Sequence, residues 1–228
     1  YDDAGQLVRA IDAAGATAFY GYDMAGNLVS RSAGGSTERI AYDAAGNVAS
    51  YTDGNGHRTT YAYDAASRLT ATKDALGQTV SIGYDAVGNA ISVTDARGHE
   101  TLLSYDAAGN LTGQTDRLGQ TASYAYDAEG RLAQVTAPTG AITTYARDAL
   151  GNVTEAVDAL GRKTAYAYDE LGALTSITSP SGAVELFERD VAGRLAAATD
   201  AAGSTVRYGY DAAGSLTSKS YDADPSQD

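Results

Sequence analysis

The chain has 228 residues, of which 29 are acidic and 16 basic, so its net charge at pH 7 is -13. A strongly acidic surface repels a phosphate backbone and no run of Lys or Arg offsets this, so we expect no nucleic-acid partner. Cysteine is absent and only two His occur, which excludes disulfides, thiolate metal sites and a cysteine nucleophile. No apolar run approaches about 18 residues, so no membrane span is expected.

From its first residue the chain repeats with a period of 21 residues, and each copy begins with Tyr-Asp or its equivalent. Eleven copies follow in phase. The copy that starts at Tyr22 is one residue short at Gly34-Gly35, which indicates a deletion in a loop. Arg147 and Arg189 replace the tyrosine in two copies.

Most copies carry a Tyr-Asp-x-x-Gly signature, to which we assign a structural role. Its members include Tyr22, Asp23, Gly26, Tyr63, Asp64, Tyr84, Asp85, Gly88, Tyr105, Asp106, Gly109, Tyr126, Asp127, Gly130, Tyr168, Asp169, Gly172, Tyr210, Asp211 and Gly214. One copy has Ser67 in place of the glycine. About half a period later most copies hold a second Asp-x-x-Gly, as in Asp116 to Gly119.

Asp opening and Gly closing a four-residue window is typical of a type I turn. The carboxylate is expected to accept backbone N–H bonds, and the glycine to take a positive φ. In chain order, turns are predicted at 2–5 and 12–15, and so on to 211–214, with strands of about five or six residues between them. Residues alternate between turns, as in Tyr124-Ala125-Tyr126, so the elements are predicted to be β-hairpins.

Two residues before each Asp-bearing dipeptide stands a large apolar residue, and we expect this stripe to form the core. It comprises Tyr20, Ile40, Tyr61, Ile82, Leu103, Tyr124, Tyr145, Tyr166, Phe187 and Tyr208. A three-residue loop with a bulged Gly would place Tyr126 opposite Leu132. Because the period is odd, either the second turn has a different loop, for example of four residues, or each repeat carries an extra bulge.

The predicted fold is therefore all-β: antiparallel hairpin repeats, about 22 strands in all, curled into a spiral or tubular sheet that forms part of a shell. No polar capping repeat is visible, so we expect a segment of something longer, with self-association through open sheet edges as a further possibility. The array is predicted to span residues 1–220, and an irregular tail 221–228.

The repeat, as in Tyr105-Asp106-Ala107-Ala108-Gly109-Asn110-Leu111 followed by Thr115-Asp116-Arg117-Leu118-Gly119, resembles the YD repeat of Rhs (rearrangement hot spot) proteins, insecticidal toxin complexes and teneurins. The resemblance covers residues 1 to about 220. It implies a bacterial, secreted or cell-surface β-shell that encloses a C-terminal toxin, with the remaining repeats and that toxin as partners in a longer chain. Asp224-Pro225 only faintly matches the family's self-cleavage region, so we transfer no cleavage to it.

The alternative is an adhesin-like surface array that binds carbohydrate or protein. We expect no enzyme, because no serine has a His and acid partner set and no phosphate-binding glycine loop appears. His57 and His99 follow turn glycines about 19 Å apart, too far to share a metal. The Asp ladder is expected to cap its own turns rather than hold calcium. No cofactor is expected. Arg147 and Arg189, each after a Pro-containing turn, are interpreted as structural. Stacking on neighbouring rings, or a position that faces a cargo or an interface, is the alternative.

Overall fold

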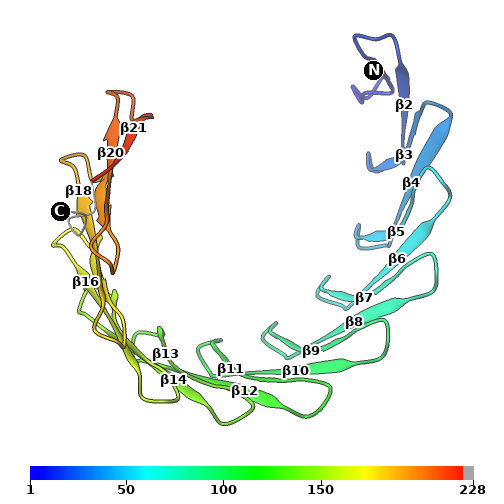
Figure 1. The fold of residues 1–228 in the computed structure, drawn as a ribbon. Coiled ribbons are helices and arrows are strands. Elements are labelled where there is room, and N and C mark those ends of the chain that lie inside the picture. Colours follow the sequence, from blue (N-terminus) through cyan, green and yellow to red (C-terminus); the bar gives the residue numbers. More distant parts are fainter. Residues whose placement is uncertain (223–228) are drawn as a thin grey trace. The chain divides into compact units, whose positions relative to one another are not determined.

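The computed structural model describes residues 1–222, which contain 21 strands and no helix. This confirms the predicted all-β hairpin array. The Asp224-Pro225 dipeptide lies outside the described residues. The chain divides into two compact units, residues 1–120 and 121–228. In Figure 1 the consecutive hairpins of the first unit follow a curved path.

Unit 1 contains β1 (Arg9–Ile11), β2 (Thr17–Tyr22), β3 (Leu28–Ala33), β4 (Ser36–Tyr42), β5 (Val48–Thr52), β6 (Arg58–Tyr63), β7 (Leu69–Lys73), β8 (Thr79–Tyr84), β9 (Ala90–Thr94), β10 (Glu100–Tyr105) and β11 (Leu111–Thr115). Unit 2 contains β12 (Thr121–Tyr126), β13 (Leu132–Thr136), β14 (Ile142–Arg147), β15 (Val153–Val157), β16 (Lys163–Tyr168), β17 (Leu174–Thr178), β18 (Val184–Arg189), β19 (Leu195–Thr199), β20 (Thr205–Tyr210) and β21 (Leu216–Tyr221). Within each unit, strands that follow one another in the chain pair antiparallel.

The two kinds of turn in a repeat have the same backbone geometry. At the Tyr-Asp turn, the N–H of Asp106 donates to the carbonyl of Asn110 at 3.0 Å, and that of Gly109 to Asp106 at 3.1 Å. At the second turn, the N–H groups of Asp116 and Gly119 make the equivalent bonds, each 2.9 Å. The closing glycines have φ of 86° and 76°. The predicted three-residue loop is confirmed, and the four-residue second loop is wrong.

A β-bulge after each Tyr-Asp turn accommodates the odd period. Tyr126 lies opposite Leu132, as predicted, but Ala125 lies opposite Gln134, so Ala133 is the extra residue. The bulge restores the alternation, and every signature tyrosine stays on the same face of its sheet. We call this the tyrosine face, and the face that carries residues such as Ala125 and Gln134 the small-residue face.

The short copy turns through a two-residue loop. Ala33 pairs with Ser36, and the loop residues Gly34 and Gly35 have φ of 59° and 82°. Positive φ at both positions is the requirement of a type I′ turn, which two glycines meet without strain. The predicted loop deletion is therefore confirmed.

The expected core is not formed. The stripe from Tyr20 to Tyr208 is only half-buried, and among the described residues Ala197, at 2% exposure, is the single buried hydrophobic residue. The reason is architectural: within each unit, strands contact only their neighbours in the chain, and no other strand of that unit covers either face of its sheet. In a single layer of strands, a side chain is shielded from solvent only by neighbouring side chains on the same face.

Candidate functional site at the tyrosine junctions

Each Tyr-Asp turn is closed by its own carboxylate. Asp106 Oδ1 accepts the backbone N–H groups of Ala108 and Asn110, both at 2.9 Å, and Oδ2 accepts the side-chain amide of Asn110 at 3.0 Å. The side-chain bond from Asn110, followed by its backbone bond, lowers the pKa of Asp106 from the ordinary value of 3.8. The expectation that these carboxylates cap their own turns is confirmed.

Some copies close the turn with arginine instead. The Nε of Arg68, Arg131 and Arg194 donates to the turn aspartate at 2.7 to 2.8 Å. Arg68 also lies over the ring of Tyr84, 4.7 Å from its centre, and donates to the carbonyl of Asp85 at 3.0 Å. An arginine here therefore contacts the next repeat as well as its own turn.

The signature tyrosine spans a gap between consecutive hairpins. The β9–β10 ladder stops at Leu102 and Ser92, well short of the Tyr-Asp turn. Beyond that point the Tyr105 hydroxyl donates to the Ala90 carbonyl at 2.9 Å. The same bond, 2.9 to 3.1 Å long, joins Tyr22 to Leu7, Tyr42 to Leu28, Tyr63 to Val48, Tyr84 to Leu69, Tyr168 to Val153 and Tyr210 to Leu195. The tyrosine thus ties each hairpin to the one before it.

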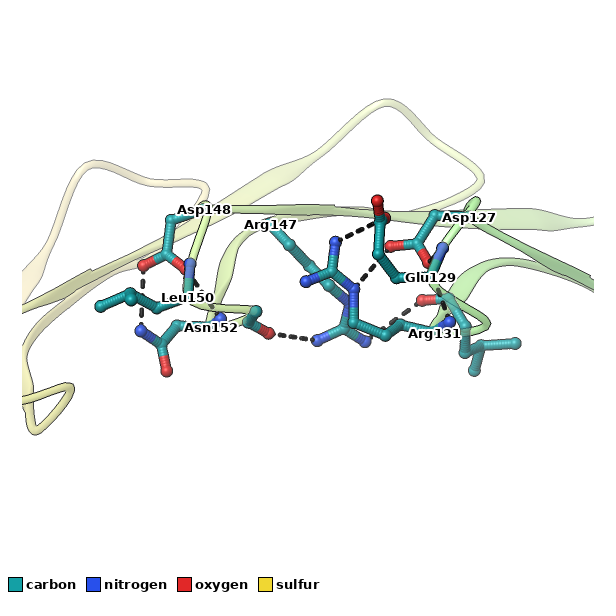
Figure 2. Close-up of polar contacts among 9 residues, drawn as sticks. Asp127, Glu129, Arg131, Arg147, Asp148, Leu150 and Asn152 are labelled. Carbon is teal, nitrogen blue, oxygen red and sulfur yellow. Dashed lines mark hydrogen bonds and ion pairs between the residues drawn. The ribbon is translucent and has the colours of Figure 1, made fainter.

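Arg147 keeps this junction where tyrosine is missing. Its Nη2 donates to the Leu132 carbonyl at 3.2 Å, the position a tyrosine hydroxyl would use, and its Nη1 donates to the Gly151 carbonyl at 3.1 Å. Figure 2 shows the guanidinium of Arg147 bonded to these two carbonyls, while Arg131 is held by Asp127 and Glu129. The structural interpretation of Arg147 therefore rests on carbonyl bonds rather than on the suggested ring stacking.

The second arginine of the tyrosine column is different. Arg189 is exposed, and its side chain makes no hydrogen bond or ion pair with another described residue. The two Arg-bearing copies have similar Pro-containing turns, yet only the Arg147 copy retains the bond to the preceding hairpin.

The Ser67 copy carries a strained turn. Ser67 has φ of 60°, the single positive φ outside glycine among the described residues. Its Oγ accepts the side-chain amide of Asn47, in the preceding Tyr-Asp turn, at 3.1 Å. A cross-repeat hydrogen bond thus partly offsets the cost of the left-handed backbone.

The two histidines lie apart, each on its own turn. His57 Nδ1 lies 3.1 Å from Asp53 Oδ2, and His99 Nδ1 lies 2.9 Å from Asp95 Oδ2. Both imidazoles are exposed, at 68% and 39%. Across residues 1–222 no group of three His, Asp or Glu side chains is arranged to hold a metal ion.

An open hollow of about 840 Å³ lies between two consecutive Tyr-Asp turns of unit 1, lined among others by Asp85, Asn89, Leu102 and Tyr105. The Asp85 carboxylate accepts bonds from its own turn, and the Tyr105 hydroxyl donates to Ala90. These two polar groups of the hollow therefore already form hydrogen bonds that stabilise the repeat.

Sequence reasoning found the tyrosine column but missed what its hydroxyl does. The available signal was a fixed spacing: in most copies the signature tyrosine follows a Leu or Val by 15 residues, as in Val48 to Tyr63.

No helix in the part of the chain that the structure describes is long and apolar enough to cross a membrane.

Comparison with known families decides what this array is. The family model for the teneurin YD-shell matches residues 60–189, more than half of the chain. The chain belongs to the YD-shell and Rhs repeat family. The Rhs repeat model matches the flanking parts, residues 1–37 and 189–226, so the YD-repeat resemblance is confirmed along most of the sequence.

Solved structures share the fold. The crystal structure of TcdB2-TccC3 superposes with a TM-score of 0.75 at 17% identity, covering 96% of this chain and 15% of that one. The complex TcdB2-TccC3-Cdc42 gives 0.57 at 15% identity, with 100% and 19% covered. The Photorhabdus luminescens Tc holotoxin pore gives 0.56 at 15% identity, with 96% and 17% covered. This YD-shell chain thus spans less than a fifth of these matched chains. No protein with a curated description matches it.

Proposed function

We propose that this YD-repeat array is a non-catalytic wall segment of an extracellular bacterial toxin shell, in which a longer chain encloses its own C-terminal effector. The observation that carries the proposal is the tyrosine junction: within each unit the hairpins are tied one to the next, while no other strand of that unit covers either face of the sheet. Such an array extends repeat by repeat without building a core, which suits a wall.

Two further observations support the proposal. The family match is to a shell-forming repeat, and the structures with similar folds are Tc toxin complexes whose chains are several times longer. The remaining repeats and the effector are then partners within the same polypeptide.

The experiment is protease protection in the full-length protein that carries these repeats. We expect the region after the repeats to resist cleavage, and a variant with Tyr63→Ala, Tyr84→Ala and Tyr105→Ala to lose that resistance. A variant with Leu76→Ala, at an exposed turn tip, should behave as the wild type. Rapid cleavage behind an intact array would overturn the proposal. Retention of the isolated chain on a glycan array would instead support the adhesin-like alternative.

A further inference from the structure

The small-residue face of unit 1 carries unbalanced positive charge in a chain whose net charge is -13. Arg39 pairs with Thr52, Thr52 with Arg58, and Thr60 with Lys73, so the three basic side chains stand on the same face. Arg9 in β1 lies on this face too. No acidic strand residue shares the face from β1 to β9, and the first is Glu100 in β10.

Arg58 lacks the acidic partner that its equivalent residue has in unit 2. There, Lys163 pairs with Glu155, eight residues earlier, at 3.2 Å. Arg58 reaches toward the equivalent position but meets the hydroxyl of Ser50, to which its Nη2 donates at 3.2 Å. Arg39, Arg58 and Lys73 are exposed and form no ion pair with another described residue, and we call them the basic patch.

The distances between the three basic residues match a ligand that carries several anionic groups along one extended chain. Neighbouring strands are about 4.8 Å apart, so Arg39 on β4 and Arg58 on β6 are about 10 Å apart, and Lys73 lies one strand further along. The hydroxyl-bearing residues Thr52 and Thr60 stand between them. Guanidinium groups bind carboxylates through two parallel N–H bonds, whereas Lys acts as a point charge.

The acidic turns on both sides of the basic patch limit the width of its partner. Asp43 and Asp64 lie at one end of these strands, and Asp53 and Asp74 at the other, separated by strands of five to seven residues, or roughly 20 Å. A wide polyanion would bring its own charges against both rows of aspartates. A single extended polypeptide can lie between them.

We propose that the small-residue face of β4–β7 docks an acidic polypeptide segment through Arg39, Arg58 and Lys73. The inference goes beyond the wall function and does not depend on whether the array encloses an effector. Charge complementarity selects the partner: exposed cations that form no ion pair attract a chain of carboxylates and steer its approach.

The test measures fluorescence anisotropy of the purified chain with a labelled peptide of alternating Glu and Ala. The variant R39T/R58T/K73T removes the basic patch, and other copies already carry Thr at these positions, namely Thr60, Thr79 and Thr52. The variant R97T/R117T/K163T removes three cations elsewhere and gives the same net charge. Circular dichroism and a melting curve establish that each variant is folded.

We expect the peptide to bind the wild type, to weaken toward about 0.3 M salt, and to lose about tenfold or more in affinity with R39T/R58T/K73T. The control variant should stay within about twofold of the wild type. Equal losses in both variants, absence of binding, or equal binding of a Gln-Ala peptide would overturn the proposal. Tighter binding of oligothymidylate than of the Glu-Ala peptide would overturn the proposal and assign the surface to a phosphate polymer. A molecular mass that rises with protein concentration in the wild type, but not in R39T/R58T/K73T, would instead assign the surface to a second copy of the chain.

Discussion

The turns at the two ends of each hairpin have the same backbone geometry but different roles in the array. At the second turn, Asp116 and Gly119 reverse the chain and the adjacent ladder runs up to the loop. At the Tyr-Asp turn the strands of successive hairpins separate, and Tyr105 crosses the gap to Ala90. The difference shows that the Asp-x-x-Gly motif makes hairpins, whereas the tyrosine makes an array of them.

Acid should have the strongest influence on stability, because it protonates turn carboxylates at both ends of the hairpins. The pKa of Asp106 is lowered by bonds from Asn110, and that of Asp95 chiefly by the backbone N–H of His99. A carboxylate whose folded pKa is depressed stabilises the protein above its unfolded value and loses that contribution as the pH falls through the folded value. Stability should therefore be constant near neutrality and collapse below about pH 3.8.

Urea unfolding at a series of pH values measures this effect. A midpoint that did not move between pH 6 and pH 2 would contradict the role of the turn carboxylates. The variant D106N, which keeps the shape but removes one titrating group, should show a slightly shallower acid transition.

Removing the tyrosine should weaken the hairpins at the Tyr-Asp end only. Tyr63→Ala deletes a half-buried ring and its bond to Val48, so the free energy of unfolding should fall by about 3 kcal/mol. Leu76→Ala, at the tip of a second turn and 83% exposed, should change it by less than about 0.5 kcal/mol. Similar values for both variants in denaturant unfolding would show that the two ends are equivalent.

Replacing the glycines tests the part that the two ends share. Gly46 and Gly56 close the two turns of one repeat with φ of 88° and 87°, and no atom lies within 4 Å of a Cβ added at either. Gly46→Ala and Gly56→Ala should each cost about 1–2 kcal/mol, because only the left-handed backbone opposes the methyl group. Clearly different melting temperatures for the two variants would contradict a common geometry of the two turns.

The copies with arginine in the tyrosine column test whether another donor can replace the tyrosine hydroxyl. Arg147→Leu should cost about 1 kcal/mol, since it removes the bonds to Leu132 and Gly151. Arg147→Tyr should recover most of the loss by restoring a donor for Leu132. Arg189→Leu is the matched control and should be nearly silent in the same unfolding assay, because Arg189 holds no such bond.

Local chemistry made much of this fold predictable from sequence. Asp and Gly act within four residues, so the turns, and the placement of Tyr126 opposite Leu132, followed from spacing alone. Because the period of 21 residues is odd, each repeat had to contain either a different second loop or a β-bulge, but the sequence did not show which. The structure has a bulge, and in the β12–β13 hairpin its extra residue is Ala133. The tyrosine junction depends on how far neighbouring hairpins separate, which sequence spacing does not give. The expected core was wrong because periodicity identifies an apolar face without showing whether another layer covers it.

One comparison within β6 tests the central claim that the tyrosine hydroxyl joins successive hairpins. Tyr63 and Tyr61 share a strand and a face, but the Tyr63 hydroxyl donates to Val48 at 3.1 Å, and that of Tyr61 has no hydrogen-bond partner among the described residues. The measurement is the free energy of urea unfolding for Tyr63→Phe and Tyr61→Phe. We predict a loss of about 1 kcal/mol for Tyr63→Phe and almost none for Tyr61→Phe. Equal effects, or a larger one at Tyr61, would contradict the account.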